Sequence, residues 1–241
     1  MKQLHAQLRA ELQLVRRNGE QLLLTLGIPL LLLVFFSLVD VLPTGTEEPV
    51  DFLAPGVLAL AVMSASMVSL GIATGFERSY HVLKRLGTTP LGRGRLVLAK
   101  ILSVVVVQLV QFALLVAVAV SLGWSASDVS VPPALGAVVL GTAAFAGVGL
   151  TLAGRLRAEL NLAAQNGLYL VLLLLGGMVV PTAELPGPLR TVAEVLPSGA
   201  LSDVLRDALG GAAVQPGTSW LVLVGWAVAA PVLAAALFRW D

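Results

Sequence analysis

The chain has 241 residues, of which 57% are hydrophobic and only 12% are charged, and its mean hydropathy is +0.92. Soluble globular proteins carry about 25% charged residues, so this composition excludes a water-soluble fold and requires lipid to cover much of the surface. The absence of cysteine excludes disulfides, thiolate metal sites and cysteine nucleophiles. The formal net charge of +1 excludes no partner by itself, and the strong preference for Arg over Lys is typical of a GC-rich, bacterial genome.

Residues 1–20 precede the first apolar stretch and are expected to form a separate amphipathic helix. Leu4, Leu8, Leu12 and Val15 fall on one helical stripe, and Glu11 lies near its edge. Basic residues occupy the rest of the surface, which is the pattern of a helix lying in the headgroup plane against anionic lipid. A solvated helix that only leads into the first span is the alternative. The segment lacks the apolar core and cleavage site of a signal peptide, so we expect the first span to be retained.

Six stretches are long and apolar enough to cross a bilayer core about 30 Å thick, which takes roughly 20 residues. In chain order they are residues 21–42, 53–74, 99–122, 133–153, 163–181 and 218–238. The expected fold class is therefore all-α, a polytopic membrane protein with six transmembrane helices.

The basic residues predict the orientation of these spans. Thirteen of the fifteen lie before the first span or in the segments after the second, fourth and sixth spans, and only Arg190 and Arg206 fall on the other side. The positive-inside rule places the thirteen in the cytoplasm. Both termini are then expected to be cytoplasmic.

The segment between the second and third spans predicts a short, capped helix beneath the membrane. Glu77 at its start and Lys84-Arg85 at its end complement the helix dipole, while Gly87 and Pro90 are suited to ending it. Val82, Leu83 and Leu86 provide an apolar edge. Such a helix is suited to docking against another protein, and the alternative is a basic loop that only sets the topology.

The outer segment 182–217, between the fifth and sixth spans, predicts two short amphipathic helices separated at Pro197-Ser198-Gly199. Leu201, Val204, Leu205 and Ala208 form an apolar stripe, and Asp203, Arg206 and Asp207 are expected on the opposite face. Backbone that re-enters the membrane is tolerated only where protein or water satisfies it. We therefore expect a re-entrant helical segment that packs on the spans or lines a cavity.

Few polar side chains lie inside the spans: Ser64, Ser66, Gln108, Gln111 and Asn166 are the main candidates. An unpaired amide in hydrocarbon is costly, so the glutamines must face another helix or an aqueous path. Interhelical hydrogen bonding is one interpretation, and a substrate path is the other. Gly71 and Gly75, with two further pairs of small residues four apart, predict close helix packing.

The chain also lacks the groups that most membrane chemistry needs. No Asp, Glu, Lys, Arg or His lies at mid-depth in a span, whereas ion-driven carriers and intramembrane hydrolases depend on such residues. No metal-ligand cluster and no phosphate-binding loop is present. We expect no catalytic residue, no metal and no nucleic-acid partner. Active transport would take its energy from a partner protein.

Two motifs give the sequence a resemblance to a known family. The first is Glu77-Arg78, then Leu83-Lys84-Arg85-Leu86 and Thr89-Pro90-Leu91, followed by Lys100 where the next span opens; the second runs from Gly176-Gly177-Met178 through Pro181, Pro186, Arg190 and Pro197 to Leu205-Arg206. The chain resembles the ABC-2 type permeases, the membrane subunits of ATP-binding-cassette exporters such as drug and antibiotic pumps. It departs from the family pattern at His81, where glycine is common, at Ser79, where an acidic residue is frequent, and at Pro188, where an aromatic is common.

The resemblance implies a six-span domain over residues 21–241, with a cytoplasmic coupling loop at 75–98 and an extracellular helical segment at 182–217. By analogy, Glu77, Arg78, Lys84, Arg85 and Leu86 would couple the spans to a separate ATPase subunit. That subunit would bind ATP and Mg, and this chain itself would hold no cofactor.

The same resemblance implies a second permease copy, identical or related, in a bacterial cytoplasmic membrane. The outer gate would include Pro181, Pro186, Arg190 and Pro197. A hydrophobic or amphipathic substrate suits the apolar spans, which also carry the possible path residues. The alternative is a non-transporting membrane scaffold or sensor that docks a cytoplasmic partner.

Overall fold

The computed structural model describes residues 2–39, 49–87, 93–125, 129–210 and 216–238. Within these ranges every regular element is a helix. The helices are α1 (Lys2–Arg17), α2 (Gly19–Leu38), α3 (Pro49–Met63), the π-helix η1 (Ser64–Ser69), α4 (Leu70–Ser79), α5 (Val82–Gly87), α6 (Arg93–Ser121), α7 (Val131–Arg155), α8 (Ala158–Leu175), the short 3₁₀ helix η2 (Thr182–Glu184), α9 (Gly187–Val195), α10 (Pro197–Ala208) and α11 (Pro216–Leu237).

Long apolar helices make up the body of the molecule. Five helical stretches among the described residues can cross a membrane by length and composition: Pro49–Ser79, Arg95–Ser121, Val131–Arg155, Ala158–Leu175 and Gly217–Leu237. A sixth candidate arises if α1 and α2, which are bent by 65° relative to each other, count as one. The predicted all-helical membrane fold is therefore confirmed, with five to six candidate spans.

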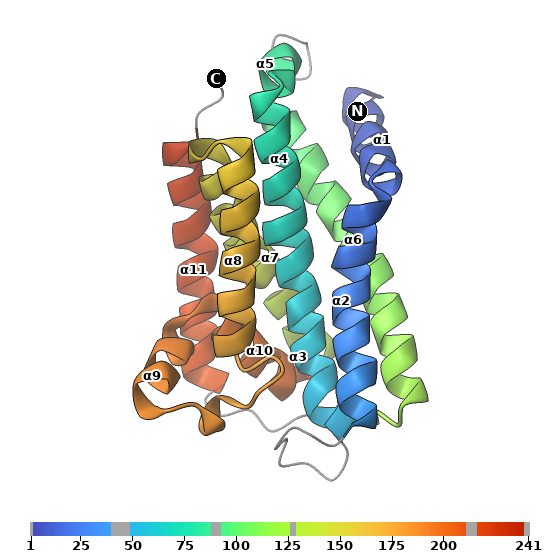
Figure 1. Cartoon of the computed structure of the whole chain (residues 1–241), viewed down its shortest axis with the longest axis vertical. Coiled ribbons are helices and arrows are strands. Elements are labelled where there is room, and N and C mark those ends of the chain that lie inside the picture. The colour runs from blue at the N-terminus through green and yellow to red at the C-terminus, as the bar shows by residue number, and fades with distance from the viewer. Residues whose placement is uncertain (1, 40–48, 88–92, 126–128, 211–215, 239–241) are drawn as a thin grey trace.

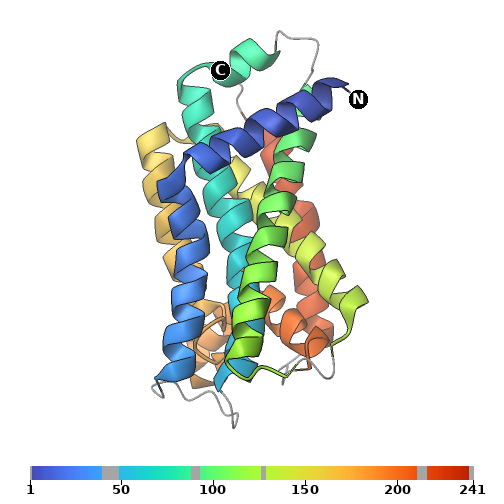
Figure 2. The same cartoon turned by 90° about the vertical axis from the view of Figure 1, so that its right-hand side faces the viewer.

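The helices form an upright bundle with different elements at its two ends (Figure 1). One end, which we call the α5 end, carries α5, α1, the start of α8 and the last turn of α11. The other end, the α10 end, carries α9 and α10. Helix α1 lies across the bundle at the α5 end instead of continuing the direction of α2 (Figure 2).

The continuous helix α3–η1–α4 is the central element of the bundle. Within its most apolar window 78% of the residues are buried, whereas in the other four candidate spans the share is at most 39%. Its middle turn is the π-helix η1, a widened turn that is frequent at functional sites. Gly149 of α7 faces this turn, and a Cβ at Gly149 would lie 2.6 Å from the Met67 carbonyl oxygen. The absence of a side chain at Gly149 thus lets α7 pack against the π-helix.

Helix α8 ends earlier than the sequence predicts. The fifth span was expected to reach residue 181, but α8 stops at Leu175 because Gly176 caps it and Gly177 turns the chain with φ of +63°. Glycine adopts this left-handed conformation without a Cβ penalty. The chain then crosses to η2 and α9.

Every residue of helix α10 except Asp207 is buried, which corrects the expected polar face of this segment. Asp203 and Arg206 were expected opposite the apolar stripe, yet both are buried, and only Asp207 of the three is exposed. The reason is that α10 packs against α3, α7, α8 and α11 together. Because only Asp207 reaches the surface, Asp203 and Arg206 must find polar partners inside the protein.

Candidate functional site

The most distinctive local geometry lies where α4 passes into α5. The Ser79 hydroxyl donates to the Phe76 carbonyl at 2.9 Å, and the rings of Phe76 and Tyr80 stack with centroids 6.1 Å apart. His81 then makes the turn with φ of +58° and is the one described non-glycine residue with a positive φ. The glycine common in the resembling family at this position would adopt that conformation without strain.

Helix α5 is held by its apolar edge and presents its polar edge outward. Leu83 is fully buried against Leu96 of α6, and Leu86 and Phe238 pack around this pair. Lys84 and Arg85 are exposed, and Tyr80 beside them is 69% exposed. The burial of Leu83 sets the rotation of the helix, so α5 is a short, anchored element with a basic and aromatic outer surface.

Glu77 does not belong to that outer surface. Its carboxylate contacts the Lys100 ammonium of α6, with oxygen–nitrogen distances of 2.8 and 2.6 Å. The same ammonium donates to Glu11 of α1 at 3.1 Å. One lysine therefore joins carboxylates from two other helices at the α5 end of the bundle.

Arg78 also points into the protein. Its guanidinium donates to the carbonyl oxygen of Leu156 at 3.0 Å, in the connection between α7 and α8. The five residues assigned to coupling thus form two sets. Glu77, Arg78 and Leu86 tie the α4–α5 unit to the bundle, whereas Lys84 and Arg85 lie on its surface. Residues Thr88 to Leu91 of the same motif lie outside the described residues.

Four of the five polar candidates for a substrate path are buried within this one chain. The hydroxyls of Ser64 and Ser66 donate to the helix carbonyls of Ala61 and Val62. The Gln108 amide exchanges hydrogen bonds with the Thr142 hydroxyl of α7 at 2.9 and 3.1 Å. Gln111 donates to the Thr25 carbonyl of α2 at 2.9 Å. The interhelical alternative accounts for both glutamines in this conformation.

Asn166, the fifth candidate, has a different environment. It is exposed on the outer face of α8, and its amide donates to the Leu162 carbonyl one turn earlier. The surface around it is open: a Cβ added at Gly167 would meet no neighbouring heavy atom within 4 Å, and Leu170 is 56% exposed. A polar amide on a span surface calls for cover by protein or water, because lipid satisfies none of its hydrogen bonds.

The buried face of α8 carries a second set of amides that the sequence interpretation did not select. Asn161 donates to the Gly71 carbonyl of α4 at 3.0 Å, and Gln165 donates to the Gly149 carbonyl of α7 at 2.9 Å. The two side chains are also bonded to each other at 3.2 Å. Their spacing of four residues puts them on one helical face, which was the available signal.

At the α10 end, the predicted gate prolines mark helix starts. Pro186 precedes α9 and Pro197 is the first residue of α10, where the missing N–H of proline is not needed. Pro181 precedes η2. Arg190 forms an i,i+4 ion pair with Glu194 at 3.4 Å, and both side chains are about 40% exposed.

Most of the buried polar residues at this end belong to α10. The guanidinium of Arg206 donates to the Gly177 carbonyl just after α8 and lies 4.0 Å from the centre of the Phe52 ring of α3. Ser219 of α11 donates to the Asp203 carboxylate at 2.8 Å. Burial lowers the pKa of Arg206 to about 10, a shift that nearby Asp203 opposes, so the guanidinium stays charged at neutral pH.

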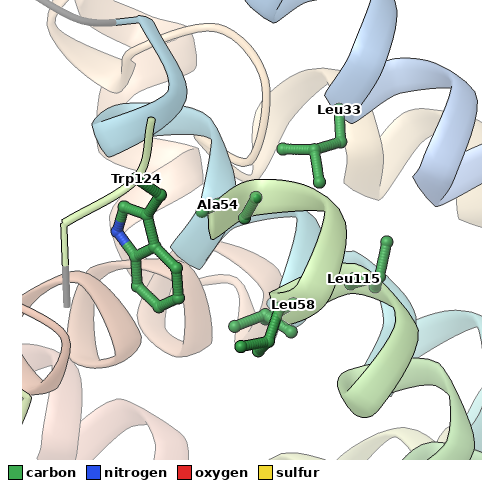
Figure 3. A pocket seen from close by; sticks show the side chains of 7 residues that line it. Leu33, Ala54, Leu58, Leu115 and Trp124 are labelled. Carbon is green, nitrogen blue, oxygen red and sulfur yellow. The ribbon is translucent and has the colours of Figure 1, made fainter. Parts of the chain in front are cut away.

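An apolar crevice lies between α2, α3 and α6 (Figure 3). It is lined by Leu33, Ala54, Leu58, Leu115, Val116, Ala119 and Trp124, and it leaves no room for a water molecule. Its lining offers aliphatic and indole carbon only, so this crevice is a packing defect between helices and not a polar path.

A model of the ABC-2 family transporter proteins matches residues 42–236, from just before α3 nearly to the end of α11. The chain belongs to the ABC-2 transporter family. The match covers both sequence motifs, the α4–α5 junction and the buried α10 of this ABC-2 protein, while α1 and α2 precede it. A comparison with curated protein sequences finds none that matches the chain. The ABC-2 assignment and the apolar helices together make the chain a multi-pass membrane protein of a transporter family.

Proposed function

We propose that this ABC-2 protein is the permease subunit of an ATP-binding-cassette exporter that moves a hydrophobic or amphipathic substrate out of a bacterial cell. The observation that carries the proposal is the anchored helix α5. Its buried edge fastens it to α6 through Leu83 and Leu96, while the central helix α3–η1–α4 runs directly into it. A force applied to α5 would therefore reach the most buried helix of the bundle.

The docking partner is a separate ATPase subunit, which binds ATP and Mg and supplies the energy. The exposed Lys84, Arg85 and Tyr80 favour an acidic partner surface with an apolar pocket, since complementary charge steers and selects partners. Basic residues of α1, α5 and the α7–α8 connection all belong to the α5 end, which supports a cytoplasmic position for that end under the positive-inside rule.

A second permease copy completes the proposed transporter. The exposed Asn166 and Gly167 on α8 favour this face for the second copy, with the path between the two chains. Ser64, Ser66, Gln108 and Gln111 would then contact a substrate only after the bundle rearranges, because each is buried here. Pro181, Pro186, Arg190 and Pro197 frame the outer end of that path.

Co-expression with a phosphate-loop ATPase encoded next to this chain tests the proposal. We expect the two proteins to co-purify and to hydrolyse ATP in vesicles. The double variant Lys84→Glu, Arg85→Glu should abolish co-purification because it reverses the charge of the docking edge. Arg155→Glu, which reverses an exposed charge at the same end of the bundle, is the matched control and should leave the complex intact.

Two results would contradict the proposal. Equal loss of the complex in the control would mean that α5 is not the docking surface. A stable complex that hydrolyses ATP but protects cells from no toxic compound and moves no labelled lipid or dye would favour the scaffold or sensor alternative.

A further inference from the structure

Three charged residues at the α5 end form a buried cluster across three helices. Lys100 of α6 lies between Glu11 of α1 and Glu77 of α4, at 3.1 Å from the first and 2.6 Å from the second. The side chains of Lys100 and Glu11 are only 7% and 9% exposed. Gln7 donates to the other oxygen of Glu11 at 2.8 Å and orients that carboxylate.

The cluster has two carboxylates for one ammonium group. A buried carboxylate without a cation is strongly unfavourable, so both carboxylates depend on the same lysine. In an environment of low polarity their attraction to it is stronger than in water, which resists separation of the three helices. If Glu77 moves and Lys100 follows it, Glu11 must follow Lys100 or be left buried without a cation, so the movement reaches α1.

Helix α1 is otherwise held by modest packing. Its leucines at positions 4, 8 and 12 and Val15 are all half-buried against the bundle, and Glu11 is the most buried residue of the helix. Glu11 lies before the residues that match the ABC-2 family, so no family motif accounts for it. A buried charge on the apolar stripe of a helix is energetically unfavourable. We therefore expect Glu11 to have a specific role there.

We propose that Glu11 and Lys100 are positioning residues that make the interfacial helix α1 move together with the coupling helix α5. This rests on the proposed function. A movement of α5 imposed by the ATPase passes along α4 to Glu77, from Glu77 to Lys100, and from Lys100 to Glu11. Helix α1 is thereby a second moving part at the cytoplasmic membrane surface, in addition to the central helix.

The absence of cysteine permits a direct measurement. Spin labels at Gln13→Cys on α1 and Arg155→Cys on α7, both exposed, report the position of α1 relative to the bundle. In the complex with the ATPase in lipid vesicles, addition of ATP and Mg should shift this distance. Glu11→Gln should keep the nucleotide-free distance and co-purification but abolish the shift. Glu159→Gln, the same substitution at an exposed position of the α5 end, should keep the shift.

Lys100→Arg keeps the positive charge and should preserve both the resting distance and the shift, whereas Lys100→Met should abolish the shift. A shift in Lys100→Arg but not in Lys100→Met would show that the positive charge is required, and not only the packing of the side chain. This comparison tests the inference even if Glu11→Gln disturbs the resting distance. A full shift in Glu11→Gln, no shift in Lys100→Arg, or no nucleotide-dependent shift in the parent complex would overturn the inference. Failure of the parent chain to bind the ATPase would instead overturn the proposed function.

Discussion

Individual glycines determine how closely the helices approach in this bundle. Gly71 and Gly75 of α4 were expected at a tight helix contact, and they face the Gln165 and Asn161 amides of α8. A Cβ at Gly71 would lie 2.1 Å from the Gln165 amide nitrogen, and one at Gly75 would lie 2.4 Å from the Asn161 amide nitrogen. The space that side chains at these glycines would occupy is therefore filled by amides, which donate hydrogen bonds to backbone carbonyls of neighbouring helices.

We predict that Gly71→Ala destabilises the protein by about 1–3 kcal/mol, because it displaces the Gln165 amide and leaves buried polar groups without partners. Thermal unfolding in detergent measures the effect. Gly167→Ala is the matched control, since no heavy atom lies within 4 Å of its Cβ position on the exposed side of α8. Equal losses in the two variants would show that the Gln165 contact is not the cause.

His81 stores local strain in the turn between α4 and α5. Its φ of +58° is left-handed, which costs an ordinary L-residue about 1 kcal/mol or more. We predict that His81→Gly raises the free energy of unfolding by about 0.5–1 kcal/mol, because glycine adopts this conformation freely. Ser79→Gly, in the last turn of α4, should instead lower it, because glycine is a poor helix former. Thermal unfolding of the two variants should therefore shift in opposite directions.

At the scale of elements, α10 is hydrogen-bonded to the ends of three helices, α7, α8 and α11. Ser202 donates to the Gly176 carbonyl at 2.7 Å, Arg206 to the Gly177 carbonyl, and Ser219 to Asp203. The backbone N–H of Ser130, before α7, donates to the Ala208 carbonyl at 2.7 Å. The α10 end is therefore held by hydrogen bonds from one central short helix, and not by the exposed Arg190–Glu194 pair.

We predict that Arg206→Met lowers stability by about 2–4 kcal/mol, because it removes a buried cation near Asp203 and leaves the Gly177 carbonyl without its donor. Arg190→Met is the matched control at the same end. Its ion pair is exposed to solvent, so its removal should change stability by less than about 1 kcal/mol. Similar thermal shifts for both variants would contradict a special role of the buried arginine.

At the scale of the whole molecule, the two ends of the bundle are built differently. The α5 end joins α1, α4 and α6 through a shared lysine, whereas the α10 end joins α3, α7, α8 and α11 through one buried helix. Between them the helices meet through apolar side chains and a few amides. The two ends are therefore held by separate sets of contacts.

The second permease copy proposed above is expected to lie against the exposed face of α8. Asn166→Cys would place the one cysteine of the chain on that face, and we expect cross-linking of two chains in native membranes by a short bifunctional thiol reagent. Leu221→Cys on α11, where the leucine is 76% exposed, is the control and should remain uncross-linked. Cross-linking at position 221 alone would place the second copy against α11 instead.

The amino-acid sequence by itself determined that lipid covers much of this protein, that its fold is helical and which family it belongs to. Exclusion of charge from lipid leaves long apolar runs that are visible without any structure, and the motif around Glu77 and Lys84-Arg85 lies in one continuous stretch. The spans were predicted to within about six residues at each described end, and α8 stops at Leu175, six residues before the predicted end of the fifth span. The end of α5 near Gly87 was also predicted, but its start was wrong: Glu77 lies in α4, and the turn at His81 delays the start of α5 to Val82.

Only the tertiary structure decided which polar groups meet. Glu11, Glu77 and Lys100 are separated by up to 89 residues in the chain, and nothing local indicates that one ammonium serves both carboxylates. Likewise Arg206 and Asp203 have the spacing of a solvated face, yet four surrounding helices bury them. Partners of buried charges are set by helix packing, which depends on side chains distant in sequence. Periodicity therefore predicts a polar face, and only the packing shows what that face contacts.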